Sequence, residues 1–312
     1  MKHSYKVTLI LLFTFLLAQF VGLAVVYKYI DFNLSTEEHT VFKDLPFGER
    51  PEVEEQTSFI PLLIAILLGT GLLLLLIKFN LTWIWKAWFF TAVLASLFIS
   101  FNAFIPLIIA FSLALLSTIW KIWKPGFLIQ TGTELFIYGG LAAIIVPLLN
   151  IMSVSILMVL IALYDAYAVW KSKHMITLAK SQAKAKIFAG LLIPYRETRT
   201  PRKINLKTIK SFKIKNLLQR ITKVKKKLDK HPQKIRTAML GGGDIGFPLI
   251  FAGVLMKELG LWQVFIIPFF AAAGLSYLLF FGDEKKFYPA MPFIGAACFV
   301  GLGVVYLIQF LI

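Results

Sequence analysis

Charged residues, acidic ones above all, and cysteine are scarce in this 312-residue chain. It holds 16 Asp and Glu against 33 Lys and Arg, and charged residues make up 16% of the total, whereas soluble domains carry about 25%. Cys298 is the only cysteine. One cysteine excludes an internal disulfide and a cysteine-based zinc cluster.

Apolar residues are abundant and gathered into long runs. They make up 58% of the chain, and the mean hydropathy is positive. Because a helix needs about 20 apolar residues to span a bilayer, this composition predicts an all-α multispanning membrane protein. Nine apolar runs are expected to be transmembrane helices: 7–26, 59–77, 82–100, 103–120, 134–149, 151–170, 237–256, 260–281 and 288–312. An odd number of spans puts the two termini on opposite sides of the membrane.

The net charge of +17 is concentrated in one segment. Residues 171–236 contain 21 Lys and Arg against two acids, which is typical of a cytoplasmic loop attracted to anionic lipid and does not favour nucleic-acid binding. We therefore expect three parts: a six-helix bundle (1–171), a basic loop (172–236) and a three-helix part (237–312). Apolar residues at helical spacing over 214–228 predict an amphipathic helix on the lipid surface.

The orientation in the membrane follows from the basic residues in the short connections. Eight lysines fall on the side of the N-terminus: Lys2, Lys6, Lys78, Lys86, Lys121, Lys124, Lys285 and Lys286. Four basic residues fall on the other side: Lys28, Lys43, Arg50 and Lys257. Six tryptophans, which prefer the interface, mark helix ends on the lysine-rich side: Trp83, Trp85, Trp88, Trp120, Trp123 and Trp170. We expect a cytoplasmic N-terminus and an outside C-terminus.

Two aspartates lie inside the expected spans, where a charge costs about 2.5–3.5 kcal/mol at a helix centre. Asp165 precedes Lys171 by six residues, or about 9 Å along a helix, and Asp244 follows Arg236 by eight, or about 12 Å. The two helices run antiparallel, so both carboxyls sit at similar depth near the cytoplasmic face. Adjacent carboxyls at that depth share one proton, as in aspartic proteases.

The residues around the second aspartate favour a close backbone approach. Gly241, Gly242 and Gly243 precede Asp244, and each glycine destabilises a helix interior by about 1 kcal/mol relative to alanine. Their benefit is contact with a neighbouring helix or an extended substrate segment. The proline-rich residues 289–292 open the last span at nearly the same depth, and we expect residues 289–291 to offer uncommitted backbone beside the carboxyls.

Three short motifs together resemble one family. Tyr164-Asp165, Gly241-Gly242-Gly243-Asp244 and Pro289-Ala290-Met291 are similar to the YD, GxGD and PAL motifs of presenilins and signal peptide peptidases, the intramembrane aspartyl proteases. Motif order, the spans that carry the motifs and the nine-span count agree over essentially the whole chain. The stretch from Tyr164 to Met175 most resembles archaeal presenilin homologues, which favours a prokaryotic cell membrane.

The resemblance implies a presenilin-like fold and specific site residues. Asp165 and Asp244 would be the catalytic pair, with Tyr164, Gly241 and Gly243 as supporting residues. Pro289, Ala290 and Met291 would bind the substrate, and Met291 stands where the motif has leucine. The implied reaction is hydrolysis within transmembrane helices of single-span membrane proteins, and no metal or organic cofactor is expected.

Other functions were weighed against this one. Intramembrane acids and broken helices also occur in proton- or cation-coupled transporters, but no inverted repeat is evident. Prepilin peptidases share the GxGD aspartate but not the other two motifs, and no Ser-His pair or zinc motif supports a serine or metallo-type protease. Glu134 begins the fifth expected span on the cytoplasmic side, where a carboxylate favours the helix N-terminus, so we do not expect it to be catalytic.

Overall fold

The computed structural model describes residues 5–36, 40–50, 54–124, 126–172, 188–196, 235–282 and 288–311. Two compact units are distinguished. The larger comprises Met1–Leu192 and Met239–Ile312, and the smaller comprises Ile193–Ala238. The expected amphipathic helix over 214–228 lies outside the described residues.

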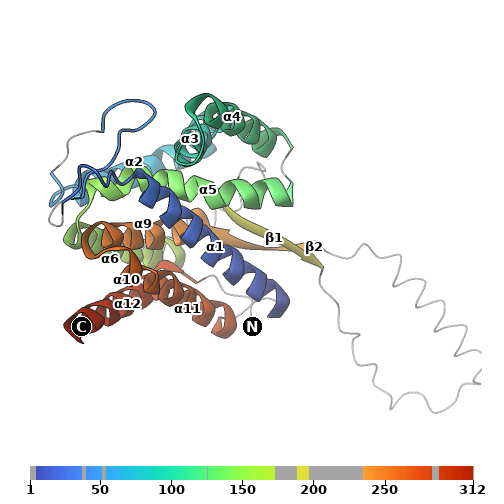
Figure 1. The fold of residues 1–312 in the computed structure, drawn as a ribbon. Helices are drawn as coiled ribbons and strands as arrows, with labels where there is room; N and C mark the ends of the chain where they lie inside the picture. Colours follow the sequence, from blue (N-terminus) through green and yellow to red (C-terminus); the bar gives the residue numbers. More distant parts are fainter. Residues whose placement is uncertain are drawn as a thin grey trace, which may run out of the picture. The chain divides into compact units, whose positions relative to one another are not determined.

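The expected apolar runs are helical (Figure 1). The helices before the basic loop are α1 (Tyr5–Tyr29), α2 (Phe59–Lys78), α3 (Thr82–Asn102), α4 (Leu107–Trp123), α5 (Phe127–Ile145) with the 3-10 turn η1 (Val146–Leu148), and α6 (Ile151–Trp170). Those after it are α9 (Gly242–Leu259), α10 (Leu261–Val264), α11 (Ile266–Phe281) and α12 (Met291–Leu311).

Six of the described helical segments are long and apolar enough to cross a membrane: α1, α2, α3, α5 with η1, α6 and α12. Helices α4 and α11 are shorter and apolar. Helix α9 has the length of a span but carries three charged residues, Asp244, Lys257 and Glu258. The prediction of a multispanning helical membrane protein is confirmed.

The seventh run differs from expectation at its start. Residues 235–241 form a strand, β2 (Ile235–Gly241), paired with β1 (Gly190–Arg196) in a two-stranded sheet. The amide of Gly242 donates to the carbonyl of Ala189 at 3.1 Å, so the end of β2 meets the start of β1. The prediction of a helix from residue 237 was therefore wrong at its start, because the backbone of residues 235–241 pairs with β1 and α9 begins only at Gly242.

One proline and one asparagine define the turn between α5 and α6. Pro147 lies in η1, and Asn150 precedes the first residue of α6. The Asn150 side chain accepts a hydrogen bond from the amide of Ser153 at 2.8 Å, which satisfies one of the free donors of that helix end. The turn sets α6, and with it Asp165, next to α9.

Small residues let α5 pack closely on α1 and α3. A β-carbon added to Gly140 would lie 1.9 Å from the carbonyl oxygen of Ser96 in α3. One added to Gly139 would lie 3.1 Å from the Cα of Gly22 in α1. Backbones that approach this closely gain dispersion contacts, which matter most where lipid supplies no hydrophobic driving force. Helix α5 is thus held between two neighbours.

The segment between α1 and α2 is fastened to the ends of several helices. Arg50 donates to the carbonyls of Lys43 and Ala143, and the hydroxyl of Thr40 donates to the carbonyl of Lys257 at 2.8 Å. Lys257 also forms an ion pair with Glu55 at 2.7 Å. These contacts hold the acidic segment over the C-terminal end of α9.

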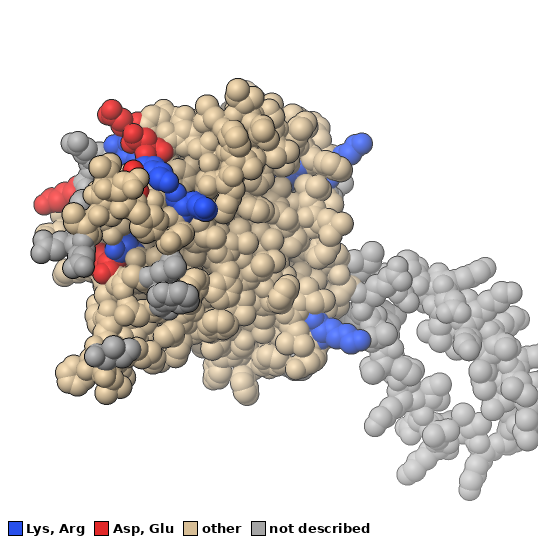
Figure 2. All heavy atoms as spheres, viewed as in Figure 1, with Lys and Arg blue, Asp and Glu red and all other residues tan. Residues whose placement is uncertain are grey.

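Charged side chains divide between two ends of the visible surface. On the face drawn in Figure 2, the described acidic residues gather toward the segment between α1 and α2, and the opposite end carries basic residues without described acids. A broad surface between them shows no charged side chain among the described residues. This is the pattern of a protein whose middle lies in hydrocarbon.

The tryptophans fit this pattern with one exception. Five of the six lie with exposed side chains on the surface: Trp83, Trp88, Trp120, Trp123 and Trp170. Trp85 is 5% exposed and packs against Leu76. It lies in the first turn of α3, as expected, but fills the corner between α2 and α3 instead of facing outward.

We expect Gly140→Ala to lower the melting temperature of the purified protein. The new methyl group would meet the backbone of Ser96, which cannot rotate away, and overpacking of this kind destabilises by about 1–3 kcal/mol. Gly132→Ala in the same helix is the control, because no atom lies within 4 Å of its added β-carbon. Equal melting temperatures for both variants would contradict the close packing of α5 on α3.

Candidate active site

Helices α6, α9 and α12 pack against one another and carry the three motifs. Asp165 lies near the end of α6 and is 8% exposed. Asp244 is the third residue of α9 and is half-buried. Because α6 ends and α9 begins near these residues, each carboxyl lies within about two turns of its helix end, as their similar predicted depth requires.

The Pro289 motif lies directly against the first aspartate. The backbone amide of Met291 donates to Asp165 Oδ2 at 3.1 Å, and the backbone of Ala290 also interacts with this carboxyl. Pro289, Ala290 and Met291 are all buried. The contact joins the start of α12 to α6, so two of the predicted site elements meet.

The expectation that residues 289–291 offer uncommitted backbone was only partly right. The carbonyl of Ala290 accepts from the amides of Phe293 and Ile294 at 3.2 and 3.1 Å, and the Met291 amide is held by Asp165. The reason is that α12 begins at Met291. The first turn of a helix needs acceptors for its amides, and Ala290 and Asp165 supply them.

The three glycines before Asp244 have different surroundings. A β-carbon on Gly242 would lie 2.9 Å from Tyr138 Oη and 3.3 Å from the carbonyl oxygen of Ala189. On Gly241 it would lie 3.3 Å from Asp244 Oδ2, and on Gly243 it would meet only the ring of Phe247, at 3.5 Å. The close approach expected for this motif is therefore to α5 and to the segment before β1, and it falls on Gly242.

Helix α1 also holds the first turn of α9. Gln19, fully buried in α1, donates from its Nε2 to the carbonyl of Ile245 at 2.9 Å. Pro248 follows inside the helix and has no N–H, so it cannot give the intrahelical hydrogen bond to the carbonyl of Asp244. A side chain from another helix thus stabilises a turn that proline weakens.

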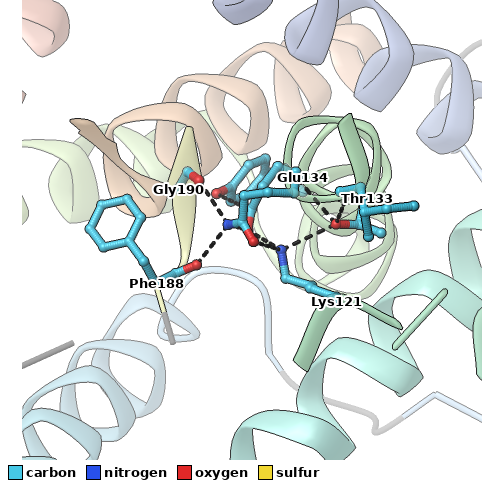
Figure 3. A network of polar contacts seen from close by, with 8 residues as sticks. Lys121, Thr133, Glu134, Phe188 and Gly190 are labelled. Atoms are coloured by element: carbon cyan, nitrogen blue, oxygen red, sulfur yellow. Dashed lines mark hydrogen bonds and ion pairs between the residues drawn. The ribbon is translucent and has the colours of Figure 1, made fainter. Parts of the chain in front are cut away.

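Two charged residues near the start of β1 have an environment that the sequence did not reveal. Lys121, expected on the cytoplasmic side, is 3% exposed and pairs with Glu134 at 2.6 Å (Figure 3). Glu134 was assigned to a helix N-terminus, but α5 begins seven residues earlier, at Phe127, and the helix dipole acts only within the first turn. The usable signal was two opposite charges 13 positions apart around a short turn.

A metal site is not indicated by the described residues. They contain no group of three His, Cys, Asp or Glu side chains placed to hold an ion.

Comparison with known proteins identifies the family. A family model described as signal-peptide peptidase, presenilin aspartyl protease matches residues 47–311. The chain belongs to this family of intramembrane aspartyl proteases. The resemblance drawn from the three motifs is confirmed, including the likeness to an archaeal presenilin homologue, and the transporter and prepilin-peptidase alternatives are set aside.

Two solved structures of a presenilin family intramembrane aspartate protease share the fold. The one in a C222 crystal form is 17% identical, with a TM-score of 0.60, and the match covers 96% of this chain and 99% of that one. The one in a P2 form is 18% identical, with a TM-score of 0.56 and 96% of each chain covered. No curated protein matches this chain.

We expect Gly242→Ala to reduce proteolysis by this presenilin-family enzyme at least about tenfold, since small displacements near a reacting centre cost that much or more. Its added methyl group would press on Tyr138 Oη and the Ala189 carbonyl. Gly246→Ala, one turn further along α9, meets Tyr138 only at an ordinary 3.7 Å and serves as control. Cleavage of a single-span substrate by each purified variant is the measurement, and equal rates would contradict the close approach at Gly242.

Proposed function

We propose that this enzyme hydrolyses peptide bonds within transmembrane helices of single-span membrane proteins, using Asp165 and Asp244 as its catalytic pair. The observation that carries the proposal is the hydrogen bond from the Met291 amide to Asp165. It joins two of the three motifs, and α9 with the third packs against both helices. Family membership supplies the aspartyl class of the reaction.

The two carboxyls share one proton in the active state. One aspartate removes a proton from a water molecule that attacks the scissile carbonyl, and the other donates a hydrogen bond or proton to the carbonyl oxygen. The pair works while it holds a single proton, since with none it lacks the acid and with two it lacks the base. Because the two aspartates share the proton, the roles of acid and base belong to the pair and are not assigned to one residue each.

The substrate must present extended backbone at the site. An intact transmembrane helix keeps its carbonyls in its own hydrogen-bond ladder, so it has to unwind locally before a water can attack. Pro289, Ala290 and Met291 are the proposed docking element. Their backbone groups are occupied by Asp165 and by the first turn of α12, so a bound substrate would compete with these contacts.

Tyr164, Gly241 and Gly243 are proposed as supporting residues. Gly241 lies close enough to Asp244 that a side chain there would crowd its carboxylate. The Gly243 position is exposed, next to Phe247, which leaves room for an extended segment beside it. Tyr164 directly precedes Asp165 on α6 and is half-buried.

The proposed orientation is N-terminus inside and C-terminus outside, in the cell membrane of a prokaryote. The basic residues of the short connections support it. Asp165 and Asp244 then lie in the cytoplasmic half of the bilayer.

We expect Asp165→Asn and Asp244→Asn each to reduce cleavage at least about 1,000-fold, as removal of a residue that acts in a catalytic unit does. The amide keeps the shape of the carboxyl but removes the shared-proton chemistry, so melting temperatures should stay near that of the original protein. Asp44→Asn, at an exposed aspartate between α1 and α2, is the matched control. Substantial cleavage by either active-site variant would reject the pair.

Substrate orientation provides an independent prediction. A peptide backbone has a direction, so a site that pairs with it distinguishes the two ways in which a helix can cross the membrane. The presenilin-like orientation predicts preferential cleavage of segments with an outside N-terminus, cut in the cytoplasmic half. One segment displayed in both orientations tests this, with the Asp165→Asn enzyme as blank, and exclusive cleavage of the inverted version would refute the orientation.

A further inference from the structure

A buried polar network joins α4 and α5 and reaches the start of β1 (Figure 3). Its centre is the ion pair between Lys121 and Glu134, whose side chains are 2% and 1% exposed. Lys121 also donates to Gln130 Oε1 at 3.0 Å and to the Thr133 hydroxyl at 3.1 Å. The three donors of the ammonium group are therefore all used.

The carboxylate of Glu134 is bonded on both oxygens. Oε1 accepts from Lys121 and, at 3.0 Å, from Gln130 Nε2. Oε2 accepts a short hydrogen bond from the hydroxyl of Tyr138, one turn further along α5. Positions 134 and 138 are four apart, so they lie on the same face of the helix.

Two arms of this network reach the active-site elements. Gln130 Nε2 donates to the carbonyl of Phe188 at 2.8 Å and to that of Gly190 at 3.2 Å. Gly190 begins β1, which pairs with β2 immediately before α9. The first arm therefore fixes the backbone that aligns the start of α9.

The second arm is Tyr138 itself. Its hydroxyl and ring lie against positions 242 and 246 of α9, 2.9 and 3.7 Å from where β-carbons would stand. Asp244, between these two glycines, lies within electrostatic range of the phenol. Because Glu134 holds the hydroxyl, the Tyr138 ring keeps its position against the first turn of α9, which carries Asp244.

An ion pair buried in this way is a poor source of stability. The desolvation of two charges offsets most of their attraction, and apolar replacements of the pair are often neutral or stabilising, while removal of one partner alone is costly. Stability therefore does not explain why both charges are buried here. The explanation is that they hold Gln130, which bonds to the start of β1, and Tyr138, which lies against the first turn of α9.

We propose that Lys121, Glu134, Gln130 and Tyr138 form a positioning network that holds the first turn of α9, and hence Asp244, in its reactive place. The inference rests on the proposed catalytic role of Asp244. None of the four residues is a catalytic residue, because they act through the backbone of β1 and the first turn of α9. Loss of the network lowers kcat more than it weakens substrate binding.

A matched pair of tyrosine variants tests the network. Tyr138→Phe and Tyr29→Phe each remove one hydrogen-bonded hydroxyl from a buried tyrosine. The Tyr29 hydroxyl donates to the carbonyl of Ile99 at 2.9 Å. We expect Tyr138→Phe to lower kcat at least about tenfold with KM changed less than about twofold. Tyr29→Phe should leave both values near those of the original enzyme. Equal kcat for the two variants would overturn the proposal.

A charge-balanced double variant separates positioning from folding. Glu134→Leu alone leaves the Lys121 ammonium without its carboxylate, so its melting temperature should fall. Lys121→Met combined with Glu134→Leu removes both charges and should recover the melting temperature. Its kcat should stay low, because Tyr138 and Gln130 have lost their anchor. Recovery of kcat together with the melting temperature would show a structural role only and would overturn the inference.

A measurement without turnover keeps this test separate from that of the proposed function. In the double variant, the Gly242 amide and the amides of 190–196 should exchange hydrogen at least about tenfold faster than in the original protein. Unchanged exchange there would refute the positioning role even if activity fell. If the original protein neither cleaves a single-span substrate nor binds a transition-state-analogue inhibitor, the proposed function fails, whatever the exchange result.

Discussion

A polar group between the two ends of this protein must find its partner inside the protein, because hydrocarbon offers none. This constraint accounts for the arrangement around the aspartates. The start of α12 satisfies its first amide on Asp165, and the first turn of α9 receives help from Gln19 of α1. The Lys121 and Glu134 charges pair with each other, and both are also hydrogen-bonded to Gln130. These contacts join α1, α4, α5, α6, α9 and α12 around the two aspartates and the start of β1.

The first turn of α9 is where these demands converge. Proline at 248 and glycine at 241–243 make it intrinsically weak as a helix. Contacts from α1, from α5 and from the segment before β1 compensate for this weakness. A turn held from outside can carry a carboxyl close to the helix end while leaving its backbone approachable. Local sequence that looks unfavourable is therefore part of how the aspartate is placed.

Much of this site could be predicted from the sequence, and the reason is geometric. Helix rise converts the distance of Asp165 and Asp244 from the flanking basic residues into depth, and the Pro289 motif could be placed in the same way. The spacing of Lys121 and Glu134 around a short turn is a sequence signal for their ion pair. The contacts of Tyr138 with Glu134 and with α9 could not be predicted, because they depend on which helix faces meet. The burial of Trp85 could not be predicted for the same reason, since a position at a helix end does not reveal whether the side chain turns inward.

The strand at 235–241 was missed for a different reason. Its residues continue an apolar run, and apolar content alone does not separate a strand from the start of a helix over so short a length. The glycines that follow are a sign of a break in regular structure at that point. The strand itself becomes evident only with its partner strand, whose first residues lie about 50 positions earlier.

The fastened segment between α1 and α2 bears on how water reaches the reaction. Arg50, Thr40 and Glu55 tie that segment to the helix ends remote from the aspartates, while Asp244 stands in the opening turn of α9 and Asp165 near the closing turns of α6. Each bond cut consumes one molecule of water. The shortest route for that water is the one or two helical turns at the aspartate end, rather than passage through the bundle.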